Sequence, residues 1–396
     1  MRKVQVILKV AERCNIACDY CYYFFGGDES YKKRPPYLTS EVAAEIAEYL
    51  RQGAIDLNLV QLDIVFHGGE PLMIGKERFD EYCQLFRSAI GPVTDLHLST
   101  QTNGMLIDEG WVALFAKHGV AVGISLDGTA EINDKHRIDK RGRGTHARVV
   151  KGLEALKSGY ANGSGVEPAI LTVMNPAADQ REVLGHFYHE LGVTSIGFLL
   201  PDTSYARGLG DGARAAEVGR ALNEMIEFLH KNPGVKLREI DEFYAHFQEF
   251  KAPEQRAVAA GGPGEIRNQI VVIQSDGTLA IDDSYMPTGK WRADAPVRSM
   301  RDIGFADWLD QPIYHEIRAA QDTLPDECQE CVWAKICRGG DLENRFSEAR
   351  GFNNPSIYCE ALQVMYASAC VHLVKHGYPK ERVLAKLASE PNLSAA

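Results

Sequence analysis

The chain opens with the segment Val4-Gln-Val-Ile-Leu-Lys-Val-Ala-Glu-Arg-Cys-Asn-Ile-Ala-Cys-Asp-Tyr-Cys21. Its first part, Val4–Val10, is rich in β-branched residues and is typical of a β-strand. Directly after this strand, Cys14, Cys18 and Cys21 have the spacing Cys-x3-Cys-x2-Cys. Three thiolates on one loop suit three irons of a [4Fe–4S] cube and leave the fourth iron open to a small molecule. A structural zinc site usually has four closed ligands, so the spacing favours an iron–sulfur cluster.

The opening strand is the first of several strand–helix pairs. The strand-like runs are Val4–Val10, Val60–Phe66, Thr94–Thr100, Ala121–Leu126, Pro168–Val173 and Thr194–Leu199, and the helix-like segments are Ser40–Gln52, Lys76–Ile90, Asp108–Lys117, Ala147–Ser158 and Asp179–Leu191. This alternation implies parallel strands with right-handed crossovers. We therefore predict the α/β class, with a partial (β/α)6 TIM-like barrel as the simplest architecture and an open doubly wound sheet as the alternative.

Length and charge restrict the classes of function. The chain has 396 residues, about two domains' worth, and a formal net charge of −11. The acidic balance argues against nucleic acid or an anionic membrane as the main partner. No apolar run approaches the roughly 18 residues that a membrane span needs. The alternating N-terminus is unlike a signal peptide, so we expect a cytoplasmic protein.

The second half contains fewer regular elements. We expect helices over Ala213–Asn232, Leu237–Phe250 and Lys380–Ser389, a break at Ala260-Gly-Gly-Pro-Gly264, and a hairpin formed by Gln269–Gln274 and Thr278–Asp283. These elements predict a barrel over 1–200, a helical bridge over 201–265, a small cluster-binding domain over 266–375 and a helix with a tail over 376–396.

A second cysteine set lies late in the chain. Cys328, Cys331, Cys337 and Cys359 supply four thiolates, which bind either zinc or an iron–sulfur cluster. The first cysteine set makes an iron–sulfur centre the better prediction, because soft thiolates then sit in a redox context. The two remaining cysteines, Cys83 and Cys370, lie on apolar helical segments, so we expect them to pack in the core.

With Tyr20 as its aromatic residue, the first motif resembles the Cys-x3-Cys-x-aromatic-Cys signature of radical S-adenosylmethionine (radical SAM) enzymes. In that family the open iron binds S-adenosylmethionine, whose cleavage yields a 5′-deoxyadenosyl radical that abstracts hydrogen from a C–H bond. The stretch His67-Gly68-Gly69-Glu70-Pro71 resembles the family motif that holds the methionine amino group. Its glycines let the backbone approach a ligand closely, and Glu70 offers an acceptor.

The same resemblance implies further ligand residues on the next two strands. Asn103 follows the third strand and Ser125 ends the fourth, where family members line the cofactor side of the barrel. We predict that Ser125 and Arg137 bind the methionine carboxylate, because arginine makes a bidentate match to a carboxylate. His67 is expected to face the substrate.

The late cysteines resemble the SPASM extension of peptide-modifying radical enzymes, with two departures. Asp341 stands where that pattern has a further cysteine, and the hairpin ending Ala280-Ile-Asp-Asp-Ser284 contains none. The resemblance therefore implies two [4Fe–4S] clusters rather than three. Along the hairpin strand, alternation places Asp283 on the side of Leu279 and Ile281. Burial there would raise the pKa of Asp283 toward that of a useful base.

Taken whole, the chain resembles radical maturases of ribosomally made peptides, particularly the cyclophane-forming group. The opening Ile7–Asn15 and the reduced cysteine set suggest this group, which implies β-hydrogen abstraction and a C–C crosslink to an aromatic ring. Asp283 would remove the ring proton. The expected partners are a precursor peptide with a leader and a flavodoxin- or ferredoxin-type reductant. The alternatives are a sulfatase-type maturase that forms formylglycine and a zinc-stabilised peptide-binding protein.

Overall fold

The computed structural model describes residues 3–26, 28–163, 165–205, 208, 212–247, 269–288 and 297–388. Its strands are β1 (Lys3–Ala11), β2 (Gln61–Gly68), β3 (Asp95–Thr102), β4 (Val120–Ser125), β5 (Ala169–Val173), β6 (Ser195–Leu199), β7 (Lys236–Leu237), β8 (Gln269–Ile273), β9 (Thr278–Ile281) and β10 (Arg298–Ser299). Its α-helices are α1 (Tyr22–Phe25), α2 (Ser40–Asp56), α3 (Lys76–Ile90), α4 (Glu109–His118), α5 (Ala130–His136), α6 (His146–Ala161), α7 (Gln180–Gly185), α8 (Gly212–Lys231), α9 (Arg238–Ala245), α12 (Phe305–Leu309), α13 (Pro312–Asp322), α14 (Ala334–Cys337), α15 (Cys359–Lys375) and α16 (Lys380–Ala388).

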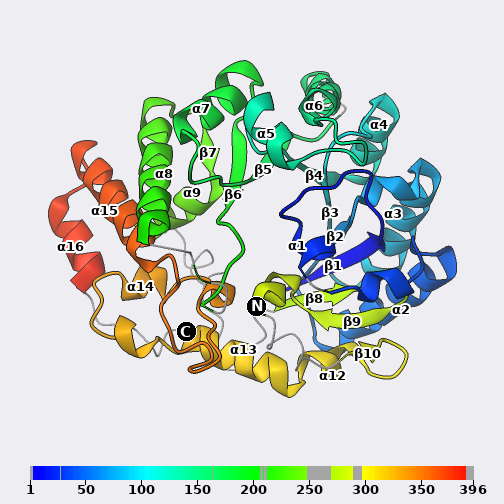
Figure 1. Cartoon of the computed structure of the whole chain (residues 1–396). Helices are drawn as coiled ribbons and strands as arrows, with labels where there is room; N and C mark the ends of the chain where they lie inside the picture. Colours follow the sequence, from blue (N-terminus) through cyan, green and yellow to red (C-terminus); the bar gives the residue numbers. More distant parts are fainter. Residues whose placement is uncertain are drawn as a thin grey trace.

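The described strands form one sheet in the order β10-β9-β8-β1-β2-β3-β4-β5-β6-β7. From β8 through β1 to β7 all neighbours are parallel. Figure 1 shows this sheet curving, with α2, α3, α4 and α6 along its outer side. This is the strand–helix alternation expected for a partial barrel, and it places the ends of all six leading strands on one rim.

Local sequence determines where several helices start and stop. The side chain of Thr39 caps α2 by accepting a hydrogen bond from the backbone N–H of Val42. In α4 the Asp108 carboxylate accepts the N–H of Trp111 at 3.0 Å. That helix ends at Gly119, whose φ of 56° is a left-handed conformation that favours glycine.

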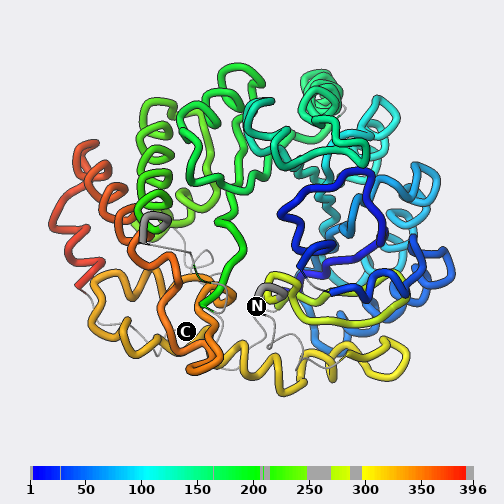
Figure 2. Tube along the Cα trace, in the orientation of Figure 1, coloured from blue at the N-terminus to red at the C-terminus, as the bar shows by residue number. Residues whose placement is uncertain are grey.

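The hairpin β8–β9 extends the barrel sheet. Strand β8 pairs with β1 in parallel, with Val6 opposite Val271, while the other edge of β1 pairs with β2. In Figure 2 the yellow-green trace of β8 and β9 runs beside the blue trace of β1. Residues far apart in the sequence are thereby brought next to the first cysteine loop.

The core lies between the sheet and its outer helices. Its centre is an aromatic cluster in which Phe79 contacts Phe66 (ring centroids 4.8 Å apart), Trp111 (5.2 Å) and Phe115 (5.7 Å). All four side chains are buried. Such offset and edge-to-face packing joins β2, α3 and α4 into a rigid support for the rim.

Some predicted boundaries differ from the structure. The helix expected over Asp179–Leu191 is α7, which ends at Gly185 and continues as a π-helical turn over His186–Glu190. The predicted break at 260–264 and residue 389 lie outside the described residues, and the four domain boundaries stay predictions. None of the helices in the described ranges combines the length and hydropathy of a bilayer-crossing segment.

Candidate active site

A cavity of about 440 Å³ opens at the carboxyl ends of the parallel strands. Among the predicted site residues, those that line it are Cys14, Cys18, Cys21, His67, Gly68, Gly69, Asn103, Ser125 and Arg137. Two predicted residues, Glu70 and Asp283, are not on this wall. Each bonds instead to a residue that is: Glu70 to Asn103, and Asp283 to Tyr22.

The first cysteine loop is held against the end of β2 by its backbone. The N–H of Gly69 donates to the carbonyl of Ala11 at 2.8 Å, and the N–H of Glu70 donates to that of Arg13 at 2.9 Å. A Cβ on Gly68 would lie 2.1 Å from the Ala11 oxygen, and one on Gly69 would lie 2.4 Å from the Arg13 oxygen. The two glycines therefore permit a close approach between strand end and cysteine loop.

The three thiols of this loop form no disulfide, and all three line the cavity. Burial raises the pKa of Cys14 to about 12 and that of Cys18 to about 11. Protein surroundings alone would therefore keep both as neutral thiols at neutral pH. A bound cationic cluster reverses this preference by deprotonating its ligands. Three free thiols converging on one cavity fit the ligand set of an iron–sulfur cube with an open iron.

Glu70 joins the ends of β2 and β3. Its carboxylate is fully buried and accepts the N–H of Leu72 (3.0 Å), the hydroxyl of Thr102 (2.7 Å) and the N–H of Asn103 (2.8 Å). Burial raises the pKa of Glu70, and these bonds oppose that rise. Asn103 in turn donates to the side chain of Asn15 at 2.7 Å. Glu70 thus orients the cavity wall.

Arg137 is buried rather than exposed on its basic stretch. Its Nη1 donates to the hydroxyl of Tyr20 at 2.7 Å and lies 3.8 Å from a carboxylate oxygen of Asp127. Its Nε is buried without a hydrogen-bond partner among the described residues. A buried guanidinium at a cavity wall with a free donor fits an anionic group such as a ligand carboxylate.

A group of charged side chains lies where strand β1 meets the β8–β9 hairpin. Lys9, fully buried on β1, forms an ion pair with Asp283, and its Nζ lies 3.1 Å from Nδ1 of His67. The hydroxyl of Tyr22 donates to the same Asp283 oxygen at 3.0 Å. Lys9 was not among the predicted site residues. A lysine inside an apolar strand was the sequence signal that could have identified it.

The structure corrects the expectation for Asp283. Burial alone would raise the pKa of Asp283, but the charge of Lys9 and the hydrogen bonds from Lys9 and Tyr22 overcome this effect and hold the pKa below its usual value. Strand β9 ends at Ile281, so the alternation used for the prediction does not reach Asp283. Its neighbour Asp282 has the raised pKa, about 6, because of burial and the charge of Asp283. Burial, with the charge of Lys9, lowers the pKa of His67 to about 3, which keeps the ring neutral.

The second cysteine set surrounds a separate small cavity. Cys328, Cys331, Cys337 and Cys359 line it, together with Trp333 and Tyr366. Burial raises the pKa of Cys328 to about 11. All four thiols are free and line this one cavity, which fits a metal centre with four thiolate ligands. The other two cysteines, Cys83 and Cys370, lie in the hydrophobic core as expected.

Comparison with known proteins identifies the family. Residues 8–174 match the model of the radical SAM superfamily. The chain is also 31% identical over 237 residues to protein MJ0907 of Methanocaldococcus jannaschii, covering 58% of this chain and 75% of that protein. The chain belongs to the radical SAM superfamily. The family resemblance, the fold class, the assignment as an enzyme and the cofactors, S-adenosylmethionine and [4Fe–4S] clusters, are confirmed.

Two further radical SAM relatives match along the chain. A cysteine-type anaerobic sulfatase-maturating enzyme of Clostridium perfringens (strain 13) is 26% identical over 384 residues, which cover 94% of this chain and 98% of that enzyme. The solved structure of native anSMEcpe with bound AdoMet and Cp18Cys peptide superposes with a TM-score of 0.76 at 22% identity, covering 94% of this chain and 98% of that one. The structural likeness establishes the shared fold. Both of these proteins are sulfatase-maturating rather than cyclophane-forming enzymes.

Proposed function

We propose that this radical SAM maturase oxidises the β-carbon of a cysteine or serine side chain in a peptide to the aldehyde of formylglycine. The main support is the sulfatase-maturating relative that matches 94% of the chain. This favours the sulfatase-type alternative over the cyclophane prediction. The observation that carries the proposal is the ionised Asp283, held by Lys9 and Tyr22 beside the cavity.

Cofactor placement follows from the ligand residues described above. Cys14, Cys18 and Cys21 would hold the cluster, and Arg137, with Ser125, would bind the carboxylate of S-adenosylmethionine. When bound, the cluster and S-adenosylmethionine together would supply the radical that takes one hydrogen atom from the substrate β-carbon. Glu70 acts as a positioning residue, because its carboxylate fixes Asn103 and the turn after β2.

The remaining proton is removed by residues of this chain. Tyr22 lines the cavity, and its hydroxyl donates to Asp283. A substrate thiol or hydroxyl that donates to the Tyr22 oxygen passes its proton through that hydroxyl to Asp283, which is ionised and therefore able to accept it. Lys9 keeps Asp283 ionised. The ring of His67 is neutral, so it adds no second positive charge to the wall of the cavity.

Oxidation of a serine alcohol to an aldehyde removes two hydrogens, here as one hydrogen atom, one proton and one electron. A cysteine thiol loses the same two hydrogens to give a thioaldehyde, which water hydrolyses to the aldehyde with release of hydrogen sulfide. Cys328, Cys331, Cys337 and Cys359 would hold the second [4Fe–4S] cluster, a centre able to take up that electron. The flavodoxin- or ferredoxin-type reductant and the binding of a leader peptide stay predictions.

Crosslinking of a peptide to an aromatic ring is a second candidate. It is favoured by the reduced cysteine set, since the hairpin lacks cysteine and Asp341 replaces one. Both candidates begin with abstraction of a β-hydrogen, so the cofactor residues serve either reaction. They differ in what happens to the substrate radical.

Anaerobic incubation with the Cp18Cys peptide and its serine counterpart, followed by mass spectrometry, tests the proposal. We expect an aldehyde that reacts with a hydrazide at the single modified residue, and its loss in the Asp283→Asn variant. A product that lacks two hydrogens, does not react with hydrazide and resists fragmentation between two residues would replace the proposal with crosslinking.

A further inference from the structure

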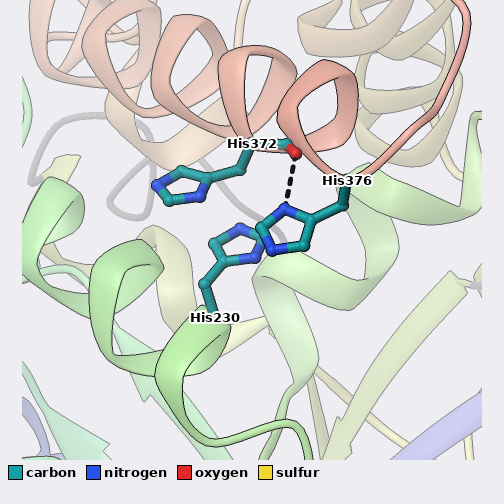
Figure 3. A group of neighbouring side chains, drawn as sticks. All are labelled: His230, His372 and His376. Carbon is teal, nitrogen blue, oxygen red and sulfur yellow. Dashed lines mark hydrogen bonds between the residues drawn. The ribbon is translucent and has the colours of Figure 1, made fainter.

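Three histidines meet where α8 and α15 end, on the side of the barrel away from the cysteine loop. His230 lies in the last turn of α8, His372 in the last turn of α15, and His376 directly after α15. One ring nitrogen from each histidine lies within 4.8 Å of the corresponding nitrogens of the other two. Figure 3 shows the three imidazoles gathered between the two helices.

Hydrogen bonds leave each ring a nitrogen that is not otherwise engaged. Nδ1 of His376 lies 2.9 Å from the carbonyl oxygen of His372, so Nδ1–H donates and Nε2 carries the lone pair. Nε2 of His230 pairs with the Tyr244 hydroxyl at 2.8 Å, which leaves its Nδ1. Nδ1 of His372 is buried and has no partner in the part of the chain that the structure describes.

The pKa values of the two stacked rings, His230 and His372, are lowered, which favours their neutral form. His230 and His372 stack with their centroids 3.7 Å apart and their planes 6° from parallel, an arrangement that two imidazolium ions would oppose. Burial and the two neighbouring histidines lower the pKa of His230 to about 4. Neutral imidazole is the form that binds metal, so protons do not compete for the nitrogen of His230 at neutral pH.

The ligand set indicates which ion fits. Three imidazoles suit Zn²⁺, Co²⁺, Ni²⁺ or Cu²⁺, whereas Ca²⁺ and Mg²⁺ prefer several oxygen ligands. Glu227, one turn before His230, bonds with Asn223 and Arg181 instead. His376 is exposed, so water has access to a fourth coordination position.

We propose that His230, His372 and His376 bind a divalent transition-metal ion, with Zn²⁺ as the physiological ion, at a site separate from both cysteine sets. Zinc–nitrogen bonds of about 2.0–2.1 Å require the rings to turn from stacked to edge-on, which places their nitrogens closer together. The ion would join the end of α8 to the end of α15. Since α15 begins at Cys359, the site would fasten the helix that carries the fourth auxiliary ligand.

The test uses the full chain with both clusters assembled, under anaerobic conditions, so that the cysteines are already occupied. Co²⁺ serves as the probe because its absorption bands distinguish nitrogen from thiolate ligands. We expect one Co²⁺ per chain, d–d bands without intense thiolate charge-transfer bands, displacement by Zn²⁺, and an increase in Tm on metal binding.

Variants locate the ion. The His376→Ala substitution, at an exposed position, should weaken binding at least about tenfold, and the double variant His230→Ala/His372→Ala should lose it. His315→Ala, an exposed histidine on α13, is the matched control and should bind as the wild type does. Circular dichroism checks that each variant folds.

Three results would overturn the site: no Co²⁺ bound by the wild type, new thiolate bands in the difference spectrum on adding Co²⁺, or unchanged affinity in the histidine variants. Peptide turnover plays no part in this measurement. Failure of the metal site is therefore distinguishable from failure of the proposed function.

Discussion

The two cysteine sites are built in different ways. The first follows β1, and its loop is fixed by backbone hydrogen bonds from Gly69 and Glu70 to that strand's extension. The second lies among short helices and turns between Pro312 and Lys375, with no described strand in that range. A sheet satisfies backbone polar groups by itself, whereas irregular segments need side chains for this purpose.

Arg345 has that role at the second site. It is 3% exposed, and its guanidinium donates to five backbone carbonyls. These carbonyls belong to Ala320, Thr323, Arg338, Phe352 and Asn354. One arginine thus replaces the ordering effect of a sheet around the four cysteines. The comparison indicates that the barrel organises the first site and a single buried cation organises the second.

The largest expected difference between the sites is chemical. Cys18→Ala should abolish cleavage of S-adenosylmethionine, because it removes a ligand of the first cluster, while Cys331→Ala should retain it. Iron should fall from ~8 to ~4 per chain in each variant. Chromatography of 5′-deoxyadenosine and an iron assay measure both effects. Equal loss of cleavage in both variants would contradict the division of roles.

Removing the arginine should damage only the second site. Arg345→Met leaves five backbone carbonyls short of a donor, of which those of Phe352 and Asn354 are buried, so we expect the free energy of unfolding to fall by about 3 kcal/mol. The second cluster's iron should be lost while cleavage of S-adenosylmethionine continues. Arg338→Met is the control, since this exposed residue donates to the Gln321 carbonyl alone. Calorimetry measures the stability of both variants, and an iron assay measures their clusters. Equal effects of the two substitutions would show that Arg345 has no special role at the second site.

Two lysines on β1 test the buried charge beside the cavity. Lys9→Met leaves Asp283 without its ion partner and should cost about 3 kcal/mol of stability. Lys3→Met removes a partly exposed pair with Asp63 (3.1 Å) and should cost less than about 1 kcal/mol. Urea unfolding compares them. In activity assays Lys9→Met should still cleave S-adenosylmethionine but form less aldehyde. If the variant forms as much aldehyde per S-adenosylmethionine cleaved as the wild type does, Lys9 has no role in proton removal.

The smallest expected effect concerns pH. Asp282 has a pKa of about 6 in the folded state, against 3.8 for an unperturbed carboxyl. Between these values the folded state binds more protons than the unfolded state, so stability falls as pH rises through this window. Asp282→Asn should remove this decline and so make the variant more stable than the wild type at pH 7. Unfolding curves at pH 4 and pH 7, with exposed Asp302→Asn as control, measure it. If the stability of Asp282→Asn falls between pH 4 and pH 7 as much as that of the wild type, other titrating groups cause the fall.

Sequence patterns predicted the barrel well because its signals are local. The run Val60–Phe66 corresponds to β2 at Gln61–Gly68, and Lys76–Ile90 coincides with α3. The sequence also predicts that the thiols of Cys14, Cys18 and Cys21 lie close together, because three cysteines within eight positions must share one loop. Glu70 was recognised from its motif, but its complete burial depends on β3 and could not be seen in β2 alone.

The remaining features depend on contacts between distant segments. Nothing in the hairpin sequence predicts that β8 pairs with β1, and without that pairing the ion pair of Lys9 with Asp283 cannot be foreseen. The predicted direction of the Asp283 pKa was wrong for this reason, since burial was inferred without its cationic partner. Arg345 and the three histidines likewise become meaningful only when separate segments meet.

Because β1 has hydrogen-bonded neighbours on both sides, the chain does not divide cleanly between its two cysteine sites. A graft that exchanges the late segment for that of a relative must also match the register of Val6 with Val271, or it will leave the opening strand with a bare edge. Chimeras should therefore be cut after the hairpin rather than before it. The same pairing implies that, during synthesis on the ribosome, strand β1 gains its second neighbouring strand only after residue 273 has emerged.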